Sequence, residues 1–216
     1  MKQIQKIMSF LCIFALFLSM AGCNTAQSSA ANEDTALEQT EKENTLQTEP
    51  ENKKLLVAYF SATGTTKALA EYAAAAMDAD LYEIVPQQQY TSEDLNYGSD
   101  NSRTSIEMGD PSARPAISGS VENMEQYEII FIGYPIWWGE APRIISTFME
   151  SYDFSGKTIV PFCTSGSSDI GSSAANLHGL CAEDALWLDG ARLSGSFTQE
   201  DMAAWIDSLG LDIQAQ

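Results

Sequence analysis

Short apolar runs alternate with helix-like segments along most of this 216-residue chain. The apolar runs predict five strands, over residues 55–60, 81–85, 128–134, 157–163 and 185–188. The segments that follow them predict helices over 67–77, 142–150, 172–180 and 199–209. Most of these strands are apolar throughout, which is typical of parallel strands covered by helices on both faces. We therefore predict an α/β domain with a doubly wound, five-stranded parallel sheet in the order 2-1-3-4-5.

Two features interrupt this regular alternation. The polar stretch 87–124 is long for a connection within a compact domain, and such stretches are often functional or mobile. A short helix is expected within it, over 102–108. Pro161 lies inside the fourth predicted strand, where it has no N–H group for a ladder hydrogen bond. We therefore expect Pro161 near a strand end or at a sheet edge.

The first predicted strand runs directly into a polar turn and then into a helix. The turn reads Ser61-Ala62-Thr63-Gly64-Thr65-Thr66. Free N–H groups at a helix start favour an anion, and the hydroxyl groups add further donors. The turn lacks both the GxxxxGK[ST] pattern of nucleoside-triphosphate loops and the GxGxxG dinucleotide pattern. We predict a site for a phosphate monoester held by neutral donors, with an ordinary capped helix start as the alternative.

Two more loops follow the third and fourth predicted strands. In the predicted strand order, both meet the first turn at the carboxyl edge of the sheet. One contains Trp137 and Trp138 between Pro135 and Pro142, and the other is the serine-rich segment 164–171. An indole ring can stack on a flat aromatic ligand, while the serine-rich loop can hydrogen-bond to the edge of a polar ring. The alternative for the tryptophan pair is packing against residues 87–124.

These three loops resemble those of the flavodoxin family, in particular the branch with a Tyr-Pro-Ile-Trp-Trp-Gly loop. The resemblance extends from about Lys54 to the end of the chain. It implies a flavodoxin-like fold that binds FMN without a covalent bond. The implied phosphate contacts are Ser61, Thr63, Gly64, Thr65 and Thr66. The implied ring contacts are Pro135, Ile136, Trp137, Trp138 and Gly139. The implied contacts of the pyrimidine edge are Thr164, Ser165, Gly166, Ser167 and Ser168.

The function implied by this resemblance is electron transfer, with the redox chemistry supplied by the flavin. The stretch 94–97 resembles the same branch, which implies that residues 87–124 cover part of the flavin. The expected partner is a redox protein or a small-molecule electron acceptor. Two alternatives stay open: an NAD(P)H-dependent FMN quinone reductase, and a flavin-free interaction module on the same fold. No residue is assigned a catalytic role. His178 is expected at the surface, and Arg103 and Arg114 are expected in ion pairs.

The N-terminus has the pattern of an export signal. Lys2 and Lys6 precede an apolar run over 7–20, which is short for a membrane span. The sequence Ser19-Met20-Ala21-Gly22-Cys23 then resembles a bacterial lipobox. It implies a lipoprotein signal peptide over 1–22, lipid on Cys23 and an extracytoplasmic protein anchored to the bacterial cell membrane. A plain secretory signal is the alternative. Residues 23–52 are predicted to be a lipidated, disordered tether, and residues 53–216 the folded domain.

The net charge limits the expected partners, and the number of cysteines limits the expected disulfides and metal sites. A formal net charge of −19 argues against nucleic acid or an anionic membrane surface, and favours a basic protein partner or an uncharged one. Cys163 and Cys181 are the cysteines of the predicted domain, and they are too few for a disulfide framework or a metal site. Both are expected to be buried, with a disulfide between them as the alternative.

Overall fold

The structure is a computed structural model that describes residues 54–213. The predicted signal peptide over 1–22, the lipid site at Cys23 and the tether up to residue 52 lie outside the described residues. No helix within residues 54–213 is long and apolar enough to cross a membrane.

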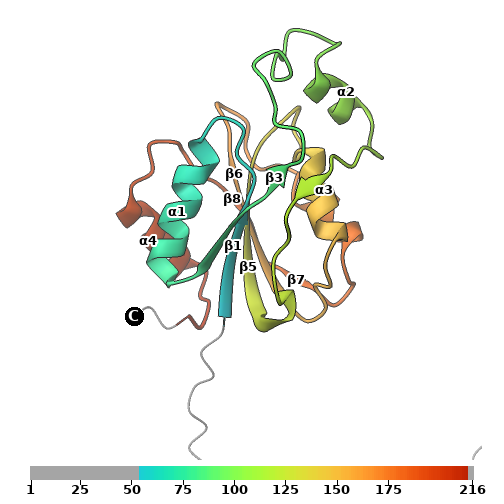
Figure 1. The fold of residues 1–216 in the computed structure, drawn as a ribbon. Helices are drawn as coiled ribbons and strands as arrows, with labels where there is room; N and C mark the ends of the chain where they lie inside the picture. Colours follow the sequence, from blue (N-terminus) through green and yellow to red (C-terminus); the bar gives the residue numbers. More distant parts are fainter. Residues whose placement is uncertain (1–53, 214–216) are drawn as a thin grey trace, which may run out of the picture. The chain divides into compact units, whose positions relative to one another are not determined.

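A parallel sheet forms the centre of the domain (Figure 1). Its strands lie in the order β2 (Asp80–Glu83), β1 (Lys54–Tyr59), β5 (Tyr127–Pro135), β6 (Thr158–Thr164) and β7 (Leu186–Trp187). A further short strand, β8 (Ala191–Arg192), also pairs with β6. The predicted order 2-1-3-4-5 is therefore confirmed. The prediction of five strands was wrong by one, because two short strands share the fifth position.

Pro161 explains why the fifth position is divided. On that side of β6, the carbonyl of Ile159 accepts from Leu188 N–H at 3.0 Å, and the carbonyl of Cys163 accepts from Leu193 N–H at 2.8 Å. Pro161 lies midway between these two carbonyls and has no N–H group to donate. A Cβ atom at Gly190 would lie 2.7 Å from the Pro161 ring, so only glycine fits opposite it. Pro161 thus lies in an interior strand, and the neighbouring strand breaks beside it.

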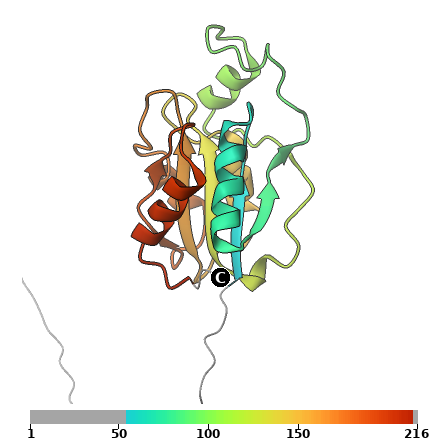
Figure 2. The ribbon, with the colours of Figure 1, turned by 90° about the vertical axis from the view of Figure 1, so that its left-hand side faces the viewer.

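Helices cover both faces of the sheet, as predicted (Figures 1 and 2). Helices α1 (Thr65–Met77) and α4 (Gln199–Ser208) lie on one face, and α3 (Arg143–Glu150) and η2 (Ala175–Leu180) lie on the other. Successive residues of each central strand alternate between the two cores: Val57 and Phe131 pack under α1 and α4, whereas Leu56 and Ile130 pack under α3. Burial on both faces is why these strands are apolar throughout.

The helix predicted over 172–180 is present only from Ala175 to Leu180, and it is a 3₁₀ helix. The segment is short, and Gly171 and Gly179 flank or interrupt it. Glycine is a poor helix former, and a helix this short gains too few hydrogen bonds to offset nucleation. The tighter 3₁₀ turns suffice to place Leu177 in the core, where it is 3% exposed.

The part of the long excursion that contains α2 (Arg103–Gly109) lies beyond the carboxyl edge of the sheet, and the chain then runs back to the amino end of β5 (Figure 1). The strand β3 (Val85–Pro86) comes just before the excursion and pairs antiparallel with β4 (Ile117–Ser118) inside it. The excursion also contains α2, and it ends where the short η1 (Met124–Gln126) begins. The helix expected over 102–108 is thus confirmed within a residue. The Tyr90 hydroxyl donates to Glu107 at 2.6 Å, and the guanidinium of Arg103 pairs with Glu107 and lies 4.0 Å from the Tyr90 ring centroid. These contacts join α2 to the start of the excursion.

Candidate cofactor site

The three predicted loops meet at one edge of the sheet because β1, β5 and β6 are neighbours. Hydrogen bonds join the loops directly. The hydroxyls of Thr66 and Thr164 lie 2.8 Å apart, which links the first loop to the third. The N–H group of Ile136 donates to the carbonyl of Thr164 at 2.9 Å, which links the second loop to the third. The three loops therefore form one continuous rim at this edge of the sheet.

The first turn of α1 is open to an anion. Gly64 is the residue before the helix, and its φ of +90° is one that glycine adopts without strain. No side chain caps this helix, and no acidic residue lies in its first turn. By contrast, α4 begins with a capping box in which Thr198 and Asp201 satisfy each other's backbone N–H groups. The positive end of the α1 dipole is thus left for a negatively charged group from outside the helix.

The predicted phosphate residues differ in exposure. Thr63, Gly64 and Thr65 are exposed, Ser61 is half-buried, and Thr66 is buried at 1%. The Ser61 hydroxyl accepts a hydrogen bond from Gly64 N–H at 3.1 Å, which shapes the turn. The ammonium group of Lys67 lies 3.7 Å from the Glu83 carboxylate. The donors of the turn 61–66 are therefore neutral N–H and hydroxyl groups.

The second loop makes a tight turn that projects one tryptophan outward. Trp137 and Glu140 exchange two backbone hydrogen bonds of 2.9 Å each. The two residues between them have positive φ angles, +48° at Trp138 and +82° at Gly139. This is the arrangement of a type I′ turn, in which a large residue at the first position is unusual. Trp138 is held in this conformation by the surrounding turn, and its side chain is 47% exposed.

The two adjacent tryptophans have different surroundings. Trp137 is only 2% exposed, and its ring packs edge-on against Phe60 at 5.5 Å and Tyr90 at 5.3 Å between centroids. The alternative of packing against residues 87–124 thus holds for Trp137. Trp138 instead lies 4.7 Å from the ring of Tyr97, which is also exposed. Of the two indoles, Trp138 is the one that a flat ligand can reach. Its neighbours Pro135 and Ile136 are half-buried, and Gly139 is exposed.

The third loop is a serine turn that follows a buried threonine. Thr164 is 5% exposed, Ser165 is half-buried, and Gly166, Ser167 and Ser168 are exposed. The Ser165 hydroxyl accepts from the N–H groups of Ser167 at 3.2 Å and Ser168 at 2.8 Å. Those two amides are engaged within the loop, whereas the hydroxyls of Ser167 and Ser168 are exposed and can donate to a ligand.

A fourth segment, over 194–196, reaches the same edge and was missed in the sequence. A Cβ atom built at Gly195 would lie 3.2 Å from the Thr65 methyl group. The hydroxyls of Ser194 and Ser196 lie 2.9 Å apart beside it. The segment follows β8, a strand that the apolar pattern did not predict. The Ser-Gly-Ser sequence was the available signal, since it resembles the composition of the other loops.

The remaining candidate residues do not form a second reactive centre. Cys163 and Cys181 are both free thiols; Cys163 is buried as expected, whereas Cys181 is only half-buried. Burial raises the pKa of the Cys163 thiol to about 12, which keeps it protonated and unreactive at neutral pH. His178 is exposed and lies against the Trp187 ring. Within residues 54–213, no group of three or more His, Cys, Asp or Glu residues could hold a metal ion.

The ion pairs expected for two arginines are present. Arg103 pairs with Glu107 at 2.6 Å, and Arg114 pairs with Glu150 at 2.7 Å. The Arg114 pair is bidentate, because Nε and Nη2 each donate to one carboxylate oxygen. This pairing raises the pKa of Arg114 and lowers the pKa of Glu150.

Comparison with known proteins identifies the family. A sequence model described as Flavodoxin matches residues 54–209. A candidate flavoprotein from Bacteroides eggerthii is 50% identical with a TM-score of 0.70, over 74% of this chain and 100% of that chain. One from Bacteroides uniformis is 44% identical with a TM-score of 0.69, over 73% of this chain and 99% of that chain. No curated protein matches the chain.

A more distant likeness concerns the fold alone. A flavoprotein from Lactobacillus acidophilus, solved in complex with FMN, is 21% identical with a TM-score of 0.54, over 74% of this chain and 99% of that chain. The family match begins at the first residue of β1 and extends beyond α4, so it includes the whole sheet and all the loops described above. The chain belongs to the flavodoxin family.

Proposed function

We propose that this chain binds FMN without a covalent bond and transfers electrons through it at the outer face of a bacterial membrane. Membership of the flavodoxin family supports a flavin cofactor, and the Lactobacillus acidophilus flavoprotein of the same fold is solved in complex with FMN. The observation that carries the proposal is the uncapped first turn of α1, beside the exposed turn at Trp138.

The residues present fit a phosphate monoester. The first turn of α1 has a free positive dipole end, and the turn 61–66 contains hydroxyl groups but no carboxylate. A carboxylate there would repel a phosphate group, and a capping side chain would compete with it. We assign the phosphate of FMN to the N–H and hydroxyl groups of Ser61, Thr63, Gly64, Thr65 and Thr66.

The second and third loops fit a flat ring with polar edges. Trp138 offers an exposed indole face, and the hydroxyls of Ser167 and Ser168 are exposed donors. Because the Tyr97 ring lies 4.7 Å from Trp138, Tyr97 is a second aromatic group at this position. We assign the isoalloxazine ring to the loop 135–139 and its polar edge to the loop 164–168.

The protein's part in the chemistry is to bind and orient the cofactor. Bound FMN would supply one- and two-electron redox chemistry. The buried cluster of Phe60, Tyr90 and Trp137 holds the second loop against the end of β1 and the excursion. The rigid turn between Trp137 and Glu140 then fixes the position of Trp138. A rigid support of this kind keeps the binding groups in place when the flavin is absent.

The proposed location and partner follow from the sequence. A lipid on Cys23 and a polar tether up to residue 52 would hold the domain near the membrane without inserting it. The net charge of −19 favours a basic redox protein or a small-molecule acceptor as the partner, and disfavours nucleic acid.

A flavin titration tests this proposal. The full chain, freed of flavin, is mixed separately with FMN, riboflavin and FAD, and the quenching of flavin fluorescence is followed. Tight binding of FMN with much weaker binding of riboflavin is the expected result, because riboflavin lacks the phosphate. Binding of none of the three flavins would contradict the proposal.

A further inference from the structure

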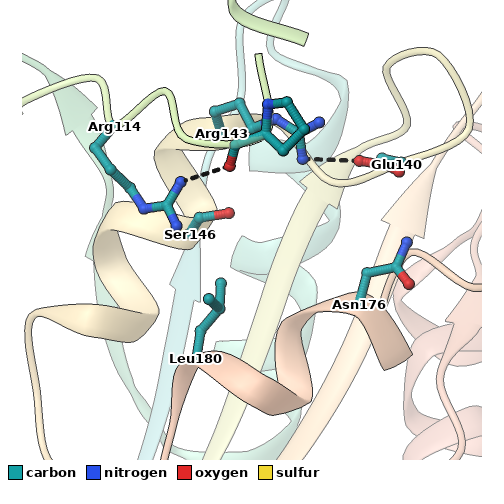
Figure 3. Close-up of a pocket in the computed structure, with 7 residues that line it drawn as sticks. Arg114, Glu140, Arg143, Ser146, Asn176 and Leu180 are labelled. Atoms are coloured by element: carbon teal, nitrogen blue, oxygen red, sulfur yellow. Dashed lines mark hydrogen bonds and ion pairs between the residues drawn. The ribbon is translucent and has the colours of Figure 1, made fainter. Parts of the chain in front are cut away.

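A cavity of about 390 Å³ opens beside the N-terminal end of α3, within the size range of small-molecule sites (Figure 3). Three separate segments line it: Pro111 and Arg114 in the excursion, the stretch from Glu140 to Ser146 at the start of α3, and η2. The cavity contains none of the residues assigned to FMN. It is therefore a distinct site that adjoins the second cofactor loop through Glu140.

Two of the four arginines of the chain line this cavity, and each is paired with a carboxylate: Arg114 with Glu150 and Arg143 with Glu140. Arg143 donates from Nη1 to the Glu140 carboxylate at 2.7 Å and from Nη2 to the carbonyl of Met108 at 3.1 Å. The Nε atom of Arg143 is buried and has no partner among the described residues. Arg143 thus has one donor, Nε, without an acceptor, and the fork of a guanidinium matches a planar carboxylate.

Other polar groups line the cavity beside Arg143. Ser146, one turn after Arg143, is only 5% exposed and lines the cavity. Asn176, an exposed residue on η2, presents its side-chain amide from the other side of the cavity (Figure 3). The unfavourable feature is the buried Nε of Arg143, because a buried donor without a partner points to a missing acceptor; the Ser146 hydroxyl and the Asn176 amide are polar groups beside it that a ligand can reach. Leu180 supplies an apolar wall below these groups (Figure 3).

We propose that this cavity binds a small organic carboxylate with an apolar body. The carboxylate replaces the Glu140 side chain on Arg143 and accepts hydrogen bonds from the Ser146 hydroxyl and the Asn176 amide. The apolar body lies against Leu180. Because the Glu140 side chain is 37% exposed, it can move into solvent when it is displaced, and Arg143 keeps a carboxylate partner throughout.

Binding in this cavity reaches the cofactor loop through Glu140. The backbone of Glu140 forms both hydrogen bonds that close the turn around Trp138 and Gly139. When a ligand releases the Glu140 side chain, the turn loses the ion pair that ties it to Arg143 at the start of α3. We therefore expect a ligand in the cavity to alter the surroundings of Trp138 although it does not touch that ring.

The proposal is tested by titrating the ¹⁵N-labelled full chain with sodium benzoate and following the protein by NMR. Benzamide serves as the neutral analogue and inorganic phosphate as an anion without an apolar body. Benzoate should give saturable shifts of the Asn176 side-chain amide and the Arg143 Nε–H signal with one Kd, whether or not FMN is bound. Benzamide and phosphate should bind at least about tenfold more weakly, because each lacks one of the two recognised features.

Variants identify the residues responsible. Ser146→Ala and Arg143→Lys should each raise the Kd for benzoate by about tenfold, since each removes donors to the carboxylate. Glu140→Gln should lower the Kd severalfold, because it weakens the group that the ligand displaces. Ser208→Ala, at an exposed serine on α4 that does not line the cavity, should leave the Kd unchanged. The absence of saturable shifts, equal binding of benzamide or phosphate, or an unchanged Kd in Ser146→Ala would overturn the proposal.

Discussion

The hydroxyl groups of Thr66 and Thr164 lie 2.8 Å apart, although 98 positions separate them in the chain. Both side chains are buried, at 1% and 5% exposure. Thr66 lies in the first turn of α1 and Thr164 at the end of β6, so this contact joins the proposed phosphate cradle to the serine loop. Each buried hydroxyl therefore depends on the other for its side-chain hydrogen bond.

The Thr66–Thr164 pair should behave as a coupled unit. Replacing either threonine by valine leaves one buried hydroxyl without its partner, which should lower the free energy of unfolding by about 1–3 kcal/mol. The double variant removes both hydroxyls and should be less destabilised than the sum of the two single variants. Urea unfolding measures all three, with Thr158→Val in the same strand as a control. Strict additivity would show that the two hydroxyls do not interact.

Replacing the two tryptophans one at a time should have different effects, one on flavin affinity and the other on the free energy of unfolding. Trp138→Ala removes an exposed ring and should leave the free energy of unfolding nearly unchanged, while weakening both FMN and riboflavin by about 1–3 kcal/mol of lost stacking. Trp137→Ala leaves a cavity in the core and should lower the free energy of unfolding by about 3–5 kcal/mol. Flavin fluorescence and urea unfolding give the two quantities. Unchanged flavin affinity in Trp138→Ala would exclude this ring from the site.

Alkaline pH should destabilise the protein in part through Cys163. Burial raises the pKa of this thiol to about 12 from an ordinary value of 9.0. Between these values the unfolded chain has lost a proton that the folded chain keeps, so the stability contributed by the neutral thiol is lost as pH rises. The slope reaches about 1.4 kcal/mol per pH unit.

Cys163→Ala tests this pH dependence. The urea midpoint of the wild type should fall between pH 9 and pH 10, and that fall should be smaller in Cys163→Ala because the titrating thiol is gone. Cys181→Ala, which removes a half-buried thiol, should change the slope less. A slope in Cys163→Ala equal to that of the wild type would contradict the assignment.

The proposed lipid anchor depends on one thiol. In a bacterium that expresses the full chain, the protein should be found in the membrane fraction and carry acyl chains. Cys23→Ser should move it to the soluble extracytoplasmic fraction, because two or more acyl chains are needed for lasting attachment. A wild-type protein without lipid that is released in the same way would favour a plain secretory signal.

The strand order of the sheet and the convergence of the three loops at one edge could be predicted from the sequence. Strands such as 55–60 and 128–134 are apolar on both faces, and this pattern requires helices above and below. Once that order is set, the positions of the turn 61–66 and the loop 134–142 follow from the geometry of parallel strands. Local residue types then indicated which loops carry polar donors.

Features that depend on contacts between distant residues could not be predicted. Trp137 and Trp138 are adjacent and chemically identical, and only the type I′ turn and the packing of Phe60 and Tyr90 send one inward and the other outward. Pro161 interrupts the pairing of β6 with its neighbour, which is why β7 and β8 are separate strands. The sequence shows the proline, but it does not show which strand lies beside it. The cavity at Arg143 likewise arises from three segments far apart in sequence.

The most direct test of the account is the affinity of Thr65→Asp for FMN and for riboflavin. Thr65 is exposed in the first turn of α1, so a carboxylate there should stabilise the helix by about 0.3–1 kcal/mol and repel a phosphate. FMN affinity should fall by about tenfold or more, while riboflavin affinity should stay within about twofold of the wild-type value. Thr65→Asn, which adds no charge, is the control. Equal loss of both flavins, or no loss of FMN affinity, would contradict a phosphate site at the start of α1.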